Sequence, residues 1–254
     1  MIIHPKLSLV GAGPGDPELI TLKGLKVLAT ADVVLYDALI DKSIVEHAPS
    51  TALKIFVGKQ KGVCQFPQEK INELIVQYTQ SHGHVVRLKG GDPFIFGRGH
   101  EELTVAKQHN IEVQIIPGVS SAVSVAGLQE IPLTRRGIND SFWVMTGTTK
   151  DHQLSRDIYH AAQSDATAVI LMGMSQLERI CEVFTKFGKA NTSVAIIQNG
   201  TLPTEKVLIG KVEDIVAKVA ESKMGSPAII IIGEVVKLHP SIWKEQSLSV
   251  SLEQ

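Results

Sequence analysis

Short apolar runs alternate with helical patterns through the first half of the chain. Strands separated by helices are typical of a mostly parallel sheet, so these residues predict an α/β unit. The predicted strands are Leu7 to Val10, Val33 to Tyr36, Lys54 to Val57, Val85 to Leu88 and Val113 to Ile116. One predicted helix follows Pro67, with apolar positions at Ile71, Leu74, Ile75 and Tyr78.

A further helix is expected directly after the first strand. Asp16 can accept a hydrogen bond as its N-cap residue, and Pro17 suits the first helical position. The buried side of this helix is expected to consist of Leu19, Leu22, Leu25 and Val27.

The second half of the chain carries four more apolar runs, and each has glycine at or near its end. They read FWVMTG, AVILMGM, VAIIQNG and AIIIIGEVV, and they predict a second α/β unit with chain reversals close to a ligand. The segment Ile131 to Ser141 combines Pro, Gly, Asn and two Arg, which favours a linker. We therefore expect an N-terminal domain over 1–132, a C-terminal domain over 133–240 and a peripheral tail over 241–254.

Composition narrows the class of protein further. The chain has 254 residues, of which 44% are hydrophobic and 20% charged, as expected for a globular protein. A net charge of −1 provides no global field to attract nucleic acid or an anionic membrane. Cys64 and Cys181 form neither a disulfide framework nor a metal-binding spacing, and no apolar run is long enough for a signal peptide or a membrane span. These features predict a cytoplasmic protein without a metal site.

The first glycine-rich loop, Gly11-Ala12-Gly13-Pro14-Gly15-Asp16, resembles a dinucleotide fingerprint only in part. Pro14 removes one N–H donor, and Asp16 stands where the third glycine belongs and would repel a phosphate. Asp37 favours the dinucleotide interpretation, because it ends the second strand about where a ribose-binding acid lies. A NAD(P)-dependent oxidoreductase therefore stays open as a less favoured alternative, as does a plain strand-to-helix turn.

A second glycine-rich loop, RLKGGDPFIFGRG, runs from Arg87 to Gly99. Its glycines permit close approach of backbone to a ligand, and a carboxylate at Asp92 suits a ligand with hydroxyls or an amine. Phe94 and Phe96 are compatible with contact to a ligand or with ordinary core packing.

These stretches together resemble the uroporphyrinogen-III C-methyltransferases of the tetrapyrrole methylase family. The matching motifs run in family order from about residue 7 to residue 236. They are VGAGPGDPELITLKGL, ADVVLYD, VGK, PQEKIN, VVRLKGGDPFIFGRG, PGVSSA, IPLTRRG, VMTG, QNGT and SPAIIIIGEVV. The long RLKGGDPFIFGRG block is the most specific of them.

The resemblance implies a fold, a cofactor and a reaction. It implies two α/β domains with S-adenosylmethionine bound in the cleft between them, and a homodimer. The implied reaction is methylation of uroporphyrinogen III at C2 and C7 to precorrin-2, for sirohaem or cobalamin. The implied cofactor-binding residues are Pro14, Gly90, Gly91, Asp92, Ile95, Ser120, Ser121, Met172, Gly200 and Ala228. Met172 ends an apolar run, so core packing is its alternative.

The resemblance also implies roles for charged residues. Asp37 and Lys59 stand at the family's base and acid positions, although Asp37 could cap a turn, Lys59 could be a solvated charge, and the two could form a simple ion pair. The polycarboxylate substrate requires cations. The candidates are Arg98, Arg135 and Arg136, with Lys61 and Lys89 as secondary candidates whose alternative is surface solvation.

Departures from the family pattern concern the substrate rather than the cofactor. Ala38 replaces a usual arginine, Arg135 and Thr148 replace histidines, and His100 replaces glycine. Methylation of a later precorrin and a non-enzymatic cofactor sensor are the alternatives to the implied reaction.

Overall fold

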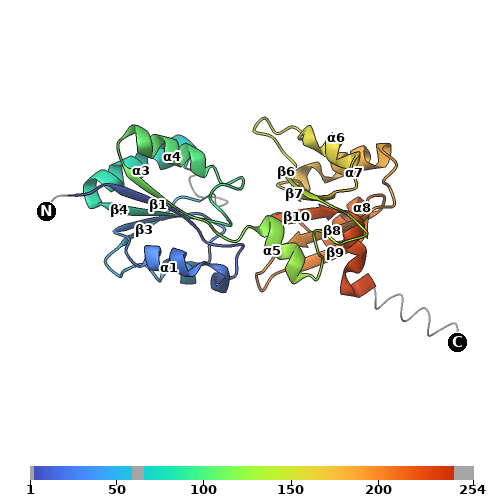
Figure 1. The fold of residues 1–254 in the computed structure, drawn as a ribbon, viewed down its shortest axis with the longest axis horizontal. Coiled ribbons are helices and arrows are strands. Elements are labelled where there is room, and N and C mark those ends of the chain that lie inside the picture. The colour runs from blue at the N-terminus through green and yellow to red at the C-terminus, as the bar shows by residue number, and fades with distance from the viewer. Residues whose placement is uncertain (1–2, 59–65, 243–254) are drawn as a thin grey trace. The chain divides into compact units, whose positions relative to one another are not determined.

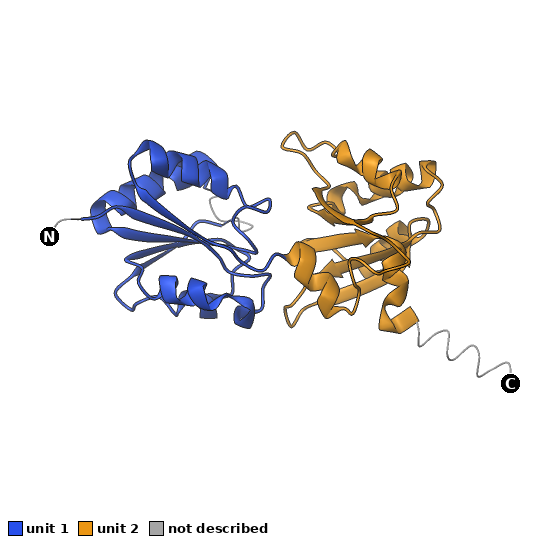
Figure 2. Ribbon diagram, viewed as in Figure 1, with its two compact units in different colours: residues 1–120 blue, residues 121–254 orange. Residues whose placement is uncertain are grey.

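The computed structural model describes residues 3–58 and 66–242, which form two compact units. Unit 1 comprises Met1–Ser120 and unit 2 comprises Ser121–Gln254 (Figure 2). The division therefore falls before the boundary expected after residue 132. The reason is the helix α5 (Ser121–Leu128), which contributes buried side chains to the core of unit 2.

Unit 1 is built on a parallel sheet of five strands in the order β3-β2-β4-β1-β5. The strands are β1 (Lys6–Gly11), β2 (Val33–Tyr36), β3 (Leu53–Phe56), β4 (His84–Lys89) and β5 (Glu112–Ile116). All five predicted strands are confirmed, and each of their ends lies within one residue of its predicted position. Because every pair is parallel, the carboxyl ends of all five strands lie along one edge of the sheet.

Helices cover both faces of this sheet, with α1 on one side and α3 and α4 on the other (Figure 1). The helical segments are η1 (Pro17–Leu19), α1 (Leu22–Leu28), α2 (Lys42–Val45), α3 (Gln68–His82) and α4 (Gly99–Gln108). The apolar positions predicted after Pro67 are confirmed for α3, where Ile71 and Ile75 are buried and Leu74 and Tyr78 pack beside them.

The helix predicted after the first strand is broken into two pieces. Asp16 accepts a hydrogen bond from the Glu18 N–H at 2.9 Å and caps only the short 3-10 segment η1. Thr21 then caps α1 by accepting from the Gly24 N–H at 3.0 Å. Because the helix restarts at Thr21, a different set of its residues is buried. The surface of Leu22 is 77% exposed, so the expectation that Leu22 is buried is wrong.

Unit 2 contains a mixed sheet in the order β6-β7-β10-β8-β9. Its strands are β6 (Phe142–Thr146), β7 (Thr167–Leu171), β8 (Ser193–Gln198), β9 (Lys206–Lys211) and β10 (Ala228–Ile232). Only β6 and β7 pair in parallel, whereas β10 and β8 run antiparallel to their neighbours. The four predicted strands are confirmed, and the edge strand β9 is an addition that the apolar pattern did not reveal.

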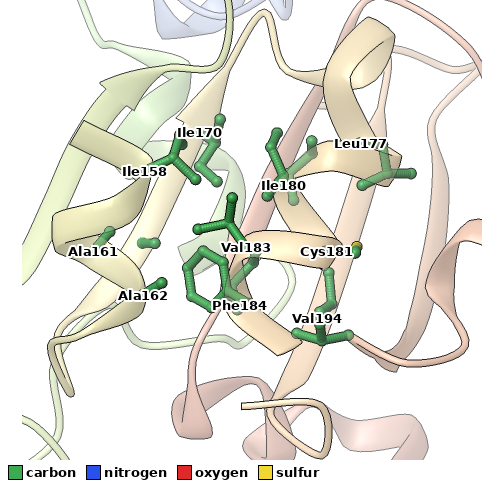
Figure 3. Close-up of a cluster of buried hydrophobic side chains, with 14 of the residues drawn as sticks. Ile158, Ala161, Ala162, Ile170, Leu177, Ile180, Cys181, Val183, Phe184 and Val194 are labelled. Atoms are coloured by element: carbon green, nitrogen blue, oxygen red, sulfur yellow. The ribbon is translucent and has the colours of Figure 1, made fainter. Parts of the chain in front are cut away.

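The principal core of unit 2 lies between this sheet and helices on one of its faces. Figure 3 shows Ile158 and Ile170 beside Ile180 and Phe184 in this cluster. The helical segments are α5, α6 (Asp157–Ala162), η2 (Met174–Gln176), α7 (Leu177–Lys186), α8 (Ile215–Ser222) and η3 (Glu234–Leu238). On the opposite face, Val125 and Ala126 of α5 pack with residues of β8, β10 and η3.

Cys181 belongs to the principal core of unit 2 and is expected to be chemically inert. Its residue surface is 5% exposed, and burial, with a smaller effect of the Glu182 charge, raises the pKa of its thiol to about 12. A Cys64→Ser variant should therefore react with a disulfide reagent at pH 8 about a thousandfold more slowly when folded than when unfolded in guanidinium chloride. Rapid release of one thiol equivalent by the folded variant would contradict this assignment.

Candidate functional site

Three loops meet at the carboxyl edge of the sheet in unit 1, after β1, β4 and β5. Gly13 and Gly91 form an antiparallel bridge in which the Gly91 N–H donates to the Gly13 carbonyl at 2.6 Å and the Gly13 N–H donates back at 3.3 Å. Both residues have positive φ, 86° at Gly13 and 63° at Gly91, which glycine adopts without a steric penalty. The two predicted glycine loops are therefore joined by their backbones.

Gly118, after β5, packs against both of these loops. A Cβ atom added to Gly118 would lie 2.2 Å from the Gly91 carbonyl oxygen and 2.7 Å from Cα of Gly11. A Cβ atom added to Gly11 would lie 2.5 Å from Cα of Gly118. We call Gly11, Gly91 and Gly118 the glycine junction. Neighbouring backbone excludes a side chain at Gly11 and Gly118, whereas at Gly91 the positive φ favours glycine.

Asp92 holds the second glycine loop in shape. One carboxylate oxygen accepts from the Phe94 N–H at 2.8 Å, and the other accepts from the Gly118 N–H at 3.1 Å. The side chain therefore ties the loop after β4 to the loop after β5. Each carboxylate oxygen retains a second lone pair for a ligand.

The apolar tip of the second glycine loop is open to solvent. Phe94, Ile95 and Phe96 are 44%, 42% and 45% exposed, so core packing is excluded as the role of Phe94 and Phe96. Phe96 and Arg98 have φ of 54° and 59°, the left-handed region that non-glycine residues rarely adopt. Such strained backbone is concentrated at functional sites. The tip thus presents a strained apolar surface at the ligand edge of the sheet.

Asp37 lies at the same edge, immediately after β2. Its carboxylate oxygen Oδ1 accepts a hydrogen bond from Nη2 of Arg87 at 2.6 Å, and its side chain is 30% exposed. Arg87 is almost fully buried within β4. Asp37 is therefore held by a buried cation while part of it remains accessible.

The cation candidates for the substrate behave differently from one another. Arg98 is exposed, but its guanidinium makes two hydrogen bonds of 2.7 Å to Glu101, and this contact raises the pKa of Arg98. Arg135 and Arg136 are exposed in the loop before β6. Lys89 is only 3% exposed and donates to Glu102 at 3.0 Å, so its assignment as a substrate contact is wrong.

Two of the lysine candidates fall outside the described residues. Lys59 and Lys61 lie within residues 59–65, beyond the end of β3 and its following turn. The roles implied for these two lysines rest on the sequence alone.

In unit 2, the candidate residues gather at one edge of the mixed sheet. The pairing of Leu171 with Ile229 and of Gln198 with Ala228 brings the carboxyl ends of β7 and β8 to the amino end of β10. Met172, Gly200 and Ala228 lie at or directly after these strand ends. These three residues, which are far apart in the sequence, therefore lie at one edge of the mixed sheet.

Met172 does not belong to the core. It is 54% exposed and has φ of 54°, and its carbonyl accepts a hydrogen bond from the Thr148 hydroxyl at 2.8 Å. The core-packing alternative for Met172 is thus excluded. Gly200, by contrast, has a packing role, because an added Cβ would lie 2.6 Å from a side-chain carbon of Val125.

The remaining cofactor candidates lie around the glycine loops and at the division between the units. Pro14 and Gly90 are half-buried, while Ser120 is buried at the end of unit 1. Ser121 begins α5 in unit 2.

Among the described residues, no group of three or more His, Cys, Asp or Glu is arranged to hold a metal ion. In the same part of the chain, the helices are too short or too polar to cross a membrane.

These features define a two-unit α/β protein whose parallel sheet carries a glycine junction at the edge where such sheets bind ligands. The chain belongs to the Tetrapyrrole (Corrin/Porphyrin) Methylases, whose family profile matches residues 6–216.

Curated relatives agree with this membership. The chain is 44% identical over 238 residues to the uroporphyrinogen-III C-methyltransferase of Methanocaldococcus jannaschii, covering 93% of this chain and 98% of that protein. It is 41% identical over 235 residues to the siroheme synthase of Nitrosomonas europaea, covering 92% of this chain. The match spans 50% of that synthase, so this chain corresponds to about half of it.

A solved structure is similar in fold as well as in sequence. The uroporphyrin-III C-methyl transferase of Thermus thermophilus, complexed with S-adenyl homocysteine, is 36% identical. The match covers 92% of this chain and 99% of that one, with a TM-score of 0.77.

Proposed function

We propose that this chain is an S-adenosylmethionine-dependent uroporphyrinogen-III C-methyltransferase that forms precorrin-2. The observation that carries the proposal is the 44% identity to the Methanocaldococcus jannaschii enzyme along 98% of its length. The residues at the carboxyl edge of unit 1 support it, because they combine a backbone cradle with an accessible carboxylate at Asp37.

The glycine junction fits this methyl donor better than it fits a dinucleotide. A dinucleotide fingerprint presents free backbone N–H groups to pyrophosphate. Here Pro14 has no N–H, the Gly13 and Gly91 N–H groups are engaged with each other's carbonyls, and Asp16 caps η1. S-adenosylmethionine carries a sulfonium cation, a zwitterionic amino acid, a ribose and an adenine, and backbone carbonyls and amides can bind these groups without charge repulsion.

The proposed cofactor contacts are the ten residues that the family resemblance implies. In unit 1 they are Pro14, Gly90, Gly91, Asp92, Ile95 and Ser120, and in unit 2 they are Ser121, Met172, Gly200 and Ala228. The bound donor would supply an electrophilic methyl group to a pyrrole carbon. Because the electron-rich macrocycle is itself the nucleophile, the protein needs to orient the reactants and to exchange protons with them.

Asp37 and Lys59 are proposed to carry out the proton transfers. Asp37→Ala is expected to lower kcat by ~100-fold or more, in line with the usual contribution of a general acid or base. Lys59→Met should have an effect of similar size, while both variants bind S-adenosylhomocysteine with unchanged affinity in isothermal titration calorimetry. If both variants methylate at close to the wild-type rate, the assignment of these two residues is wrong.

Arg135 and Arg136 are the proposed contacts to substrate carboxylates. Both are exposed, and arginine pairs bidentately with a carboxylate. Arg98 is a third candidate, which would have to exchange Glu101 for the substrate. Replacement of Arg135 and Arg136 by Gln should raise KM for the macrocycle and leave the affinity for S-adenosylhomocysteine unchanged.

The direct test is incubation with S-adenosylmethionine and enzymatically generated uroporphyrinogen III. The expected result is the absorption spectrum of precorrin-2, with two methyl groups added per macrocycle by mass spectrometry. Binding of the donor without this product would instead favour a later precorrin as the substrate, or a sensor. Hydride transfer from NAD(P)H without any methylation would favour the oxidoreductase.

The assembly and the cellular setting belong to the same proposal. The family resemblance supports a homodimer in the cytoplasm, with precorrin-2 passing to sirohaem or cobalamin synthesis. Phe142 and Trp143, on the edge strand β6, are 38% and 39% exposed and offer an apolar surface for a partner. Light scattering on the purified chain measures the number of protomers directly.

A further inference from the structure

Arg87 is an unusual residue for its place in the fold. It lies in β4, which pairs with β2 on one side and β1 on the other, and its surface is only 2% exposed. Its neighbours along the strand, Val86 and Leu88, are fully buried. A buried arginine is costly unless its charge is paired and its N–H groups have acceptors. Its retention in the middle of a sheet therefore calls for an explanation.

The Arg87 guanidinium is fixed by acceptors around its whole fork. Nε donates to Glu102 at 3.0 Å, and Nη2 donates to Asp37 at 2.6 Å. Nη1 donates to the backbone carbonyls of Leu88 at 3.1 Å and Leu35 at 3.4 Å. Burial works against the charge, but Glu102 and Asp37 outweigh it and raise the pKa of Arg87. The cation is therefore held in one orientation by groups on three different elements.

Glu102 anchors this cation from the opposite side. It lies on α4, it is fully buried, and its Oε1 atom accepts from Arg87, from Lys89 at 3.0 Å and from Gln68 at 3.3 Å. Its Oε2 atom has no hydrogen-bond partner within the described part of the chain. Lys89 contacts Glu102 but makes no hydrogen bond to Asp37. Among the described residues, Arg87 is thus the cation that joins the buried cluster to Asp37.

Arg87 bonds to only one of the two carboxylate oxygens of Asp37. Oδ1 of Asp37 is occupied by Arg87, whereas Oδ2 accepts no hydrogen bond from any residue in 3–58 or 66–242. Since Arg87 cannot move without losing Glu102 and two carbonyls, it fixes both the position and the rotation of the Asp37 carboxylate. Lysine could not replace it, because a single ammonium lacks the planar fork that reaches both carboxylates.

We propose that Arg87, anchored by Glu102, is a positioning residue that aims the free oxygen of Asp37 at the reacting macrocycle. The inference rests on the proton-transfer role given to Asp37 under the proposed function. Arg87 acts through Asp37 and does not itself touch the substrate or the methyl donor.

A double-mutant cycle separates this role from a general contribution to folding. The variants are Asp37→Asn, Arg87→Met and the two combined, with kcat, KM and the affinity for S-adenosylhomocysteine measured for each. Lys89→Met is the matched control, because it also removes a buried cation bonded to Glu102 and leaves the Arg87 contact to Asp37 in place. If Arg87→Met does not fold, Arg87→Met with Glu102→Gln replaces it throughout, since this pair removes the cation together with its counter-charge.

Arg87→Met is expected to lower kcat by ~10- to 100-fold, with KM and S-adenosylhomocysteine affinity within about threefold of wild type. Combined with Asp37→Asn, it should cause no further loss, because residues that act as one unit are not additive. Lys89→Met should keep kcat within about threefold of wild type. Multiplicative losses in the double variant, or an equal loss in Lys89→Met, would show that Arg87 has only a structural role.

Failure of the proposed function can be distinguished from failure of the positioning role of Arg87. If the wild-type chain makes no precorrin-2, that function is overturned whatever the variants do. Crystal structures of Arg87→Met and Lys89→Met then decide the positioning role. The Asp37 carboxylate should leave its wild-type rotamer in the first variant and keep it in the second; an unmoved carboxylate in Arg87→Met would overturn the inference.

Discussion

Gly118→Ala is expected to weaken the binding of S-adenosylhomocysteine by ~100-fold or more, which corresponds to about 2.7 kcal/mol. The added methyl group would lie 2.2 Å from the Gly91 carbonyl oxygen, a distance that real Cβ contacts essentially never show. The obstructing atoms are backbone on both sides, so no side-chain rotation can relieve the contact. The loops after β1 and β4 must therefore move away from the loop after β5.

The displacement should be detectable without any ligand. The Gly118 N–H donates to the Asp92 carboxylate at 3.1 Å, and separation of the loop after β5 from the loop after β4 would break this bond. Hydrogen exchange at the Gly118 amide is therefore expected to accelerate in Gly118→Ala. Isothermal titration calorimetry with S-adenosylhomocysteine measures the loss of affinity directly.

Gly127→Ala provides the matched control for this substitution. Gly127 lies within α5, and a Cβ atom added there meets no atom within 4 Å. Alanine in a helix is favoured over glycine by about 0.5–1 kcal/mol, so this variant should bind as wild type and be slightly more stable. If Gly118→Ala also kept its affinity within about threefold of wild type, the glycine junction would not be the binding site for the donor.

The strands of unit 1 could be predicted because each satisfies two local conditions at once. Each is a short run that is mainly apolar and contains at least one β-branched residue, and each is separated from the next by a turn or by a helical pattern, as at Pro67. The prediction failed at Leu22, where the chain between η1 and α1 resets the helical phase. Apolar spacing alone cannot register such a break.

Unit 2 was less accessible to sequence analysis. Strand direction depends on how distant segments pair. The local sequence therefore does not reveal that β10 and β8 pair antiparallel with their neighbours. The edge strand β9 has no fully buried residue and carries a lysine at each end, which made it resemble a connecting segment.

The sequence revealed the glycine loops of the candidate site but not the buried charges beside them. Clusters of glycine are easily recognised in a sequence. They indicate close backbone approach, because few other residues permit it. Arg87 was visible too, within VVRLK, but its pairing with Glu102 and Asp37 joins residues that are far apart along the chain. The available signal was the alternation of Val85, Arg87 and Lys89, which places two cations on one face of a buried strand. Such a face requires buried anions nearby.

Replacement of Glu102 by Ala should destabilise unit 1 by ~3–5 kcal/mol, the usual cost of removing one partner from a buried ion pair. Glu102 is fully buried and accepts hydrogen bonds from Arg87 and Lys89, which are themselves 2% and 3% exposed. Without it, Arg87 keeps Asp37 as its bonded carboxylate, whereas Lys89 loses the carboxylate to which it is bonded. Burial and the Arg87 charge already lower the pKa of Lys89, so this lysine is the cation expected to lose its proton first.

Hydrogen exchange at the backbone amides of β4 measures this loss within unit 1 itself. A Glu46→Ala variant is the exposed counterpart, because Glu46 also contacts a lysine, Lys54, at 2.6 Å, but its side chain is 70% exposed. Its removal should leave the exchange of β4 amides unchanged, since surface pairs contribute little.

A compensated variant tests whether the cost of losing Glu102 arises from charge. Glu102→Leu combined with Lys89→Met removes one buried anion and one buried cation, and leaves Arg87 paired with Asp37. Replacement of a buried pair by apolar side chains is often neutral, so this double variant should recover most of the protection lost in Glu102→Ala. If instead the double variant exchanges as fast as Glu102→Ala, the effect comes from a cavity at the packing of α4 against the sheet and not from unpaired charge.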